Sequence, residues 1–273
     1  MLTKFKLFES RFFEVPGYMT ELSLSECDNK LKTLNYFNFS DMPIYRGFGY
    51  LESGCYVIDP SVSKRQSANT MNYYTELLNN LDGWKNYPER KLICSTDALG
   101  ASSELYSKIK DSKYRNMYFR VIPLNKLSKI GICKDIDMWG SLTHVLKMFG
   151  VDSEGFMDAS FLSDIFFASG VKEDYKDIIN NFESGLIEYK KQYKEIGLDD
   201  NLMQYFDIDL ILNQIKEVGT KRFLEKAFDP NLNSFELYDY VKYSKLSEVW
   251  DKEIWLDSKC LIISQEIIDE RYS

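Results

Sequence analysis

The sequence changes character twice along the chain, and this alternation limits the folds it can adopt. Residues 43–133 contain short apolar runs typical of β-strands around one helical stretch. Residues 135–243 show the longer spacing of amphipathic helices, as in Ile178, Phe182, Leu186 and Tyr189. The last residues return to short extended runs. This order predicts an α+β fold whose final strands pair with the first sheet.

Four early stretches predict strands, namely PIYRGFGYL, CYVIDP, KLICSTD and MYFRVIPL. Between the second and third of them, apolar residues at helical spacing predict one helix, with Ser67 as its N-cap and Asp82 and Gly83 at its end. Trp255 and residues 260–263 predict the late strands. We predict a single domain over residues 1–273, with core strands in 42–133 and 245–268 and a helical insert at 135–243.

The composition is that of a folded globular protein, because 273 residues with 44% hydrophobic and 15% aromatic side chains can fill a sizeable core. The 42 acidic and 34 basic side chains give a net charge of −8, which argues against a general nucleic-acid or membrane-surface binder. No stretch reaches the ~20 apolar residues of a membrane span, and the first residues lack the apolar run of a signal peptide. We therefore predict a cytoplasmic protein with no membrane partner.

Cysteine and histidine usage narrows the possible chemistry. The five cysteines are scattered without any CxxC spacing, so we expect neither a metal site nor a disulfide framework. His144 is the only histidine, which excludes most Ser-His-Asp, Cys-His and metal-hydrolase mechanisms. An enzyme of this composition would depend on arginine, serine, tyrosine and carboxylate side chains.

An arginine inside an apolar strand is the first candidate site residue. Arg46 lies within MPIYRGFGY and is followed by Gly47. Its guanidinium can present several donors to a phosphate while the glycine lets the backbone approach. The more common role of a strand arginine is to reach solvent or to pair at a sheet edge.

Two further pairs of candidate residues lie near strand ends. Ser95 and Thr96 follow a predicted strand and could orient a ligand, although such hydroxyls more often cap a turn. Asp251 and Glu253 stand at i and i+2, so both carboxylates point to one face of an extended chain. Like charges placed in this way are either solvated or held by a cation or ligand.

Taken together, these residues resemble the arginine, serine-threonine and glutamate-x-glutamate pattern of the ADP-ribosyltransferase superfamily, in the order in which that superfamily has it. The matching stretches are YRG, ICSTD followed by YFRVIP, and DKEIWLDSKCLII. The resemblance covers residues 42–124 and about the last thirty residues, and implies a split β-sheet core with the helical block as an insertion. The block from Ser63 to Thr96 also resembles uncharacterised proteins of tailed phages.

The resemblance implies NAD as the substrate and no metal. Glu253 would hydrogen-bond the ribose and stabilise an oxocarbenium-like transition state, with Asp251 and Ser95 beside it in the catalytic group. Arg46, with Gly47, would bind a phosphate of NAD, and Ser95, with Thr96 beside it, would brace the strand and orient Glu253. Asp251 stands where the family has Glu or Gln, a position that often helps to select the acceptor. The identity of the acceptor is therefore open.

Other residues are weaker candidates for the cofactor site. Tyr73, Tyr74 and Trp84 could offer a flat surface to nicotinamide, although aromatic residues at helical spacing more often belong to the core. Arg65 and Arg90 are further phosphate candidates, each more commonly a solvated surface charge.

The predicted function is mono-ADP-ribosylation of a protein or nucleic-acid acceptor, in a phage-encoded takeover of the host or in counter-defence within the host cytosol. Two alternatives remain open: a non-catalytic structural or host-interacting phage protein on the same fold, and an NAD glycohydrolase that uses water. Glu248, in SEVW, is the alternative to Glu253 as the catalytic carboxylate.

Overall fold

The computed structural model describes most of the chain, with gaps. The described residues are 17–36, 43–48, 51–62, 72–97, 118–133, 138–151, 162–196, 207–243 and 252–272.

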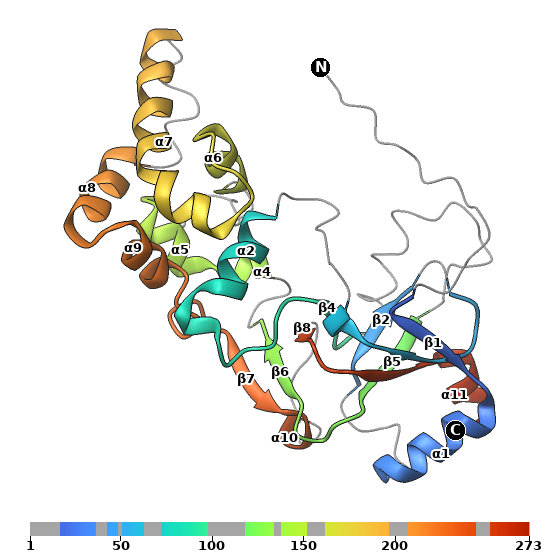
Figure 1. Ribbon diagram of the computed structural model, residues 1–273. Coiled ribbons are helices and arrows are strands. Elements are labelled where there is room, and N and C mark those ends of the chain that lie inside the picture. Colours follow the sequence, from blue (N-terminus) through green and yellow to red (C-terminus); the bar gives the residue numbers. More distant parts are fainter. Residues whose placement is uncertain are drawn as a thin grey trace.

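The centre of the fold is one nine-stranded sheet in which every paired neighbour is antiparallel (Figure 1). Its strands are β1 (Met19–Leu22), β2 (Tyr45–Gly47), β3 (Cys55–Ile58), β4 (Leu92–Ser95), β5 (Tyr118–Pro123), β6 (Lys129–Ile132), β7 (Glu236–Asp239), β8 (Glu253–Leu256) and β9 (Cys260–Ser264). The spatial order is β1-β3-β9-β5-β2-β4-β8-β6-β7. The last strands, β8 and β9, therefore lie between early ones, and β1 and β7 form the two edges of the sheet as the described residues build it.

The helices fall into two groups. The α-helices are α1 (Leu24–Leu34), α2 (Tyr73–Asn80), α4 (Met138–Ser141), α5 (Thr143–Met148), α6 (Leu162–Ala168), α7 (Tyr175–Ile196), α8 (Ile208–Val218), α9 (Thr220–Ala227), α10 (Tyr240–Tyr243) and α11 (Gln265–Arg271), with short 3-10 turns at Pro60–Val62 and Asp82–Trp84. Figure 1 shows α5–α9 gathered with α2 at one end of the molecule, far from α1 and α11.

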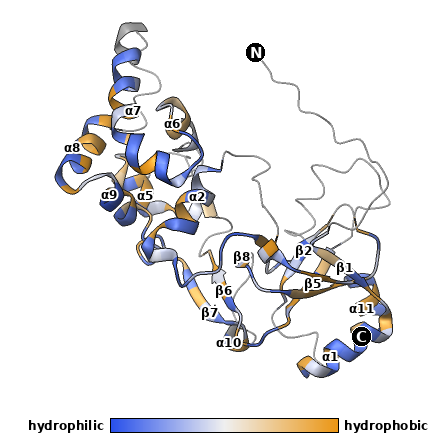
Figure 2. Cartoon of the chain, viewed as in Figure 1, coloured by the Kyte–Doolittle hydropathy of each residue, from blue (hydrophilic) through white to orange (hydrophobic). Residues whose placement is uncertain are grey.

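Two hydrophobic cores correspond to these groups. The first joins the helical group to the sheet through Ile93 on β4 and Trp255 on β8. The second surrounds the central strands and includes residues of α1 and α11. Figure 2 shows hydrophobic and hydrophilic residues alternating along α7, as expected for a helix with one buried face. The α4–α9 block thus packs on the sheet through a continuous apolar contact.

The predicted α+β class is confirmed, and so are strands in all four early stretches and in the last thirty residues. The helix start was predicted five residues too early: the N-cap of α2 is Asn72 and the helix begins at Tyr73, while Ser67 lies outside the described residues. The range predicted as helical also contains β7, because Phe235 is buried and the next residues extend the sheet beside β6. Strand β1 and helix α1 had no counterpart in the predictions.

Local sequence explains where α1 begins. The Ser23 side chain accepts a hydrogen bond from the Glu26 backbone N–H, and the Glu26 carboxylate accepts one from the Ser23 N–H. This capping box satisfies two backbone donors that a helix start would otherwise leave unpaired.

Among the described residues, no helix combines the length and the hydrophobicity that crossing a membrane requires.

Candidate functional site

The three strands that carry the predicted site are direct neighbours. Strand β4 lies between β2 and β8, so the arginine, serine and glutamate stretches stand in the spatial order β2-β4-β8. Ser95 is paired with Tyr45 on one side and with Glu253 on the other. Paired residues of neighbouring strands point to the same face. Ser95 and Glu253 therefore share one face of the sheet.

The same register brings in Arg120, an arginine that was not among the predicted site residues. Tyr45 is also paired with Arg120 on β5, which places Arg120 in the row that continues through Ser95 to Glu253. Arg120 is only 3% exposed, and its guanidinium donates to the hydroxyls of Tyr45 at 3.2 Å and Tyr36 at 3.4 Å. The sequence signal that could have identified Arg120 was its place in the predicted strand YFRVIP. It lies two residues after Tyr118 and therefore on the same strand face.

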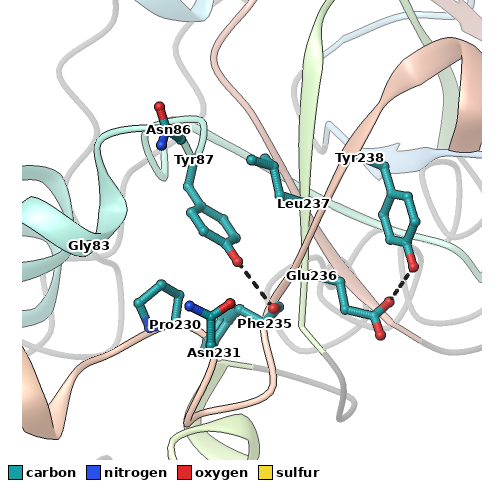
Figure 3. A pocket seen from close by; sticks show the side chains of 9 residues that line it. All are labelled: Gly83, Asn86, Tyr87, Pro230, Asn231, Phe235, Glu236, Leu237 and Tyr238. Carbon is teal, nitrogen blue, oxygen red and sulfur yellow. Dashed lines mark hydrogen bonds between the residues drawn. The ribbon is translucent and has the colours of Figure 1, made fainter.

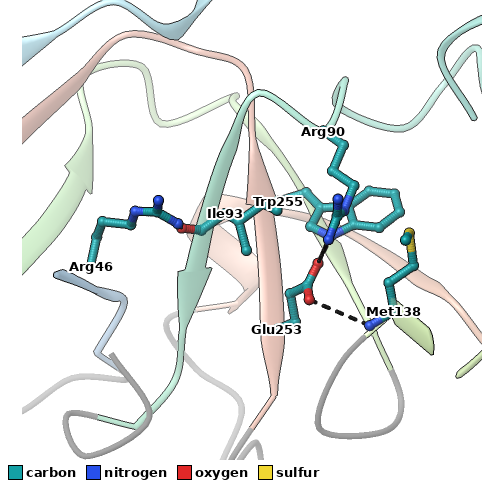
Figure 4. Close-up of polar contacts among 6 residues, drawn as sticks. All are labelled: Arg46, Arg90, Ile93, Met138, Glu253 and Trp255. Carbon is teal, nitrogen blue, oxygen red and sulfur yellow. Dashed lines mark hydrogen bonds and ion pairs between the residues drawn. The ribbon is translucent and has the colours of Figure 1, made fainter. Parts of the chain in front are cut away.

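The carboxylate of Glu253 is held by several donors (Figure 4). Its Oε1 accepts from Arg90 Nε at 3.3 Å, from Arg90 Nη2 at 3.1 Å and from Trp255 Nε1 at 2.6 Å. Its Oε2 accepts from the Met138 backbone N–H at 3.4 Å, a long hydrogen bond. Oε1 is therefore saturated, whereas Oε2 retains capacity for another donor.

This arrangement is a buried ion pair. The side chain of Arg90 is 7% exposed and that of Glu253 is 11% exposed. The guanidinium of Arg90 also lies over the Trp255 ring, 5.7 Å from its centroid. The prediction that Arg90 is a solvated surface charge was thus wrong, because the residues around it form the interface between the sheet and the helical group.

Arg46 does not join this group. Tyr45 pairs with Ser95 and shares its face of the sheet. Successive side chains of a strand point to opposite faces, so Arg46 points to the other face of β2. Its Nη1 donates to the carbonyl of Ile93, and its guanidinium lies 5.9 Å from the centre of the Phe48 ring. Figure 4 shows Arg46 on one side of β4 and Glu253 on the other. Gly47, which follows Arg46, is half-buried and pairs with Tyr118.

Ser95 and Thr96 tie the end of β4 to its surroundings. Ser95 Oγ accepts from the Asp97 backbone N–H at 3.0 Å. Thr96 is buried, and its Oγ1 accepts from the Lys252 backbone N–H at 2.9 Å. The Thr96 N–H donates to the Lys252 carbonyl at 3.0 Å. Thr96 therefore fixes the backbone just before Glu253, and Ser95 stabilises the turn that follows β4.

The aromatic candidates lie in the helical core. Tyr73 is 2% exposed, donates to the Val171 carbonyl at 2.8 Å and stacks on Phe166. Tyr74 is equally buried, and Trp84 stacks on Trp255. In this arrangement the three rings pack against protein, the more common role for aromatic residues at helical spacing.

Three candidates lie outside the described residues: Asp251, Glu248 and Arg65. Within the described part of the chain, no group of three or more histidine, cysteine, aspartate or glutamate side chains could hold a metal ion. No protein-family model, curated protein or solved structure matches the chain.

Proposed function

We propose that the protein transfers ADP-ribose from NAD to a macromolecular acceptor. The observation that supports this most is the spatial order β2-β4-β8, with Ser95 directly opposite Glu253. The sequence resemblance requires these three strands to be neighbours, although they are separated by up to about 200 residues in the chain. A nine-stranded sheet allows many strand orders, and chance alone would seldom place these three stretches side by side.

The chemistry suits the residues available. The glycosidic C–N bond of NAD breaks, its electron pair leaves with neutral nicotinamide, and an acceptor oxygen or nitrogen forms the new bond to the ribose and loses a proton. The transition state carries positive charge on the ribose, which a fixed carboxylate stabilises. In this proposal Arg90 and Trp255 orient Glu253 through Oε1, and Oε2 hydrogen-bonds the ribose.

The proposal also requires Arg46 to change its hydrogen-bond partner. To bind a phosphate of NAD, its guanidinium must exchange the hydrogen bond to the Ile93 carbonyl for phosphate oxygens. Because Arg46 points to the face of β2 opposite that of Ser95 and Glu253, a change of its rotamer alone does not place the guanidinium beside an NAD bound at Glu253, and the end of the strand must shift as well.

The test is incubation of the purified protein with NAD labelled on the adenine, with and without a cell lysate. We expect label on an acceptor in the lysate for the wild type and a loss of at least ~100-fold for Glu253→Gln, because one preorganised charge is removed. Glu21→Gln, which removes an exposed strand carboxylate on β1, is the matched control and should retain activity. Release of nicotinamide without lysate would identify water as the acceptor.

A second candidate function is binding without catalysis, and the buried ion pair favours it. A carboxylate whose charge is already balanced by Arg90 is a structural tie between the sheet and α4. If folded wild-type protein consumes no NAD with protein, nucleic acid or water as acceptor, the binding role is the better one.

A further inference from the structure

A pocket of about 500 Å³ lies at the opposite edge of the sheet from β1, along β7 (Figure 3). None of the residues predicted for the NAD site lines it. The lining residues that matter here are Asn86, Tyr87, Asn231, Glu236, Leu237 and Tyr238. Three of these are consecutive residues of β7, so the pocket follows the strand itself. Figure 3 shows Leu237 directed toward Tyr87 while Glu236 and Tyr238 lie on the other side of the strand.

Among the described residues, no strand pairs with the outer edge of β7 at this pocket. The Tyr240 N–H donates to the Ser128 carbonyl at 2.9 Å, which makes this a hydrogen-bonded pair of the β6–β7 ladder. Hydrogen-bonded pairs alternate along an antiparallel ladder. The backbone groups of Tyr238 and Glu236 therefore face β6, whereas the N–H and C=O of Leu237 point away from it. In the part of the chain that the structure describes, β7 pairs with β6 alone.

The described residues that line the pocket carry a negative charge, whereas Asp239 at the end of β7 is paired with Lys129 and Lys242. The described lining of the pocket contains the Glu236 carboxylate and no lysine, arginine or histidine. Burial raises the pKa of Tyr87, and the carboxylates of Asp229 and Glu236 raise it further. Glu236 is exposed and accepts a hydrogen bond from the Tyr238 hydroxyl at 2.7 Å, which leaves its other lone pairs open to a second donor. A phosphate-bearing ligand would be repelled here, and a cation attracted.

We propose that this edge binds an extended basic peptide segment of a partner protein, which adds a strand beside Leu237 and places a lysine or arginine opposite Glu236. The N–H and C=O of Leu237 supply two backbone hydrogen bonds, as in other cases of strand addition. The peptide residue opposite Leu237 enters the pocket between Tyr87 and the side-chain amides of Asn86 and Asn231. Its two neighbours fall on the face of Glu236 and Tyr238, where a basic residue forms a cross-strand ion pair.

The probe is a blocked six-residue peptide of alternating valine and arginine with a fluorescent label, titrated by anisotropy. Leu237→Pro removes the outward N–H but leaves the ladder to β6 intact, because proline is tolerated where the N–H faces away from the sheet. We expect it to weaken binding by about tenfold. Glu236→Gln should weaken binding roughly threefold, and a peptide with glutamate in place of arginine should not bind.

The other edge of the sheet offers a matched control. The Asp59 N–H donates to the Tyr18 carbonyl at 2.9 Å, and the same alternation directs the Glu21 N–H outward from β1. Glu21→Pro should leave peptide binding unchanged, with folding of all variants checked by circular dichroism.

Three outcomes would overturn the proposal. One is the absence of binding up to about 1 mM peptide. Another is equal binding by wild type and Leu237→Pro, or by the arginine and glutamate peptides. The third is a dimer in sedimentation that Leu237→Pro dissociates, which would assign the edge to a second copy of the chain. None of these outcomes depends on NAD, so the proposal stands or fails apart from the transferase function.

Discussion

The two sides of β4 hold a guanidinium in different ways. On the side of β2, Arg46 is half-buried, donates to the Ile93 carbonyl and lies beside Phe48. On the side of β8, Arg90 is buried, donates twice to Glu253 and lies over Trp255. The first contact involves a neutral carbonyl, and the second a carboxylate.

This difference separates an arginine that can change partners from one that cannot. A guanidinium does not lose its proton, so a buried arginine needs a compensating charge, and removing that charge is strongly unfavourable. A half-buried arginine can exchange a carbonyl for water or for a phosphate at a smaller change in free energy. Arg46 is therefore suited to a ligand, and Arg90 to holding Glu253 in place.

The largest expected effect comes from breaking the buried pair. Arg90→Met should lower the free energy of unfolding by about 3 kcal/mol, because among the described residues it leaves the buried Glu253 carboxylate with the Trp255 and Met138 N–H groups as its donors. Urea denaturation monitored by tryptophan fluorescence measures this change. An effect below about 0.5 kcal/mol would mean that solvent reaches the pair.

The double variant Arg90→Met/Glu253→Leu sharpens the same comparison. With both charges replaced by apolar groups, we expect most of the lost stability to return, since a buried ion pair and well-packed apolar side chains are often of similar stability. If NAD consumption disappears in the double variant while its fold is intact, the loss belongs to the chemistry of Glu253 and not to unfolding. A double variant less stable than Arg90→Met would show that the apolar pair does not pack there.

How much of this region could be predicted from sequence depends on the range of the interactions. The strands around Arg46, Ser95 and Glu253 follow from short apolar runs, which are local signals. The pairing of Arg90 with Glu253 joins residues 163 positions apart, and no local pattern indicates it. The register between β2 and β4 likewise places Arg46 and Ser95 on opposite faces, and only the assembled sheet determines this register.

The edge at β7 illustrates the same limit. Residues 236–239 follow a long helical block, and ELYD alone is too short to distinguish a strand from the end of a helix. Its pairing with β6, more than 100 residues earlier, makes it a strand. Tertiary contact thus decides the structure where local propensity is weak.

A smaller effect is expected on the other side of β4. Arg46→Lys keeps the positive charge but loses the planar set of donors, so NAD binding should weaken by about tenfold while stability changes by less than about 1 kcal/mol. Calorimetric titration with NAD measures the first quantity and urea denaturation the second. Unchanged NAD affinity would assign Arg46 to its contacts with Ile93 and Phe48 alone.

The smallest effect concerns the half-buried histidine of the helical block. His144, in α5, has its pKa lowered from the ordinary value of 6.5, first by burial and then by Lys226 and Lys147, with Asp229 acting weakly in the opposite direction. The unfolded chain binds a proton near pH 6.5 and the folded chain only at lower pH, so stability should fall as the pH drops below about 6.5.

His144→Gln removes this proton uptake. The difference in melting temperature between wild type and variant should shift in favour of the variant between pH 7.5 and pH 5.5, by less than the change caused by Arg90→Met. Unlike Arg90, His144 can lose its charge, and burial lowers its pKa and so favours the neutral form. If the difference in melting temperature stays constant with pH, the folded and unfolded chains bind the same number of protons at His144. The imidazole is then solvated enough to be protonated in the folded state, and His144 differs from Arg90 in its exposure to solvent.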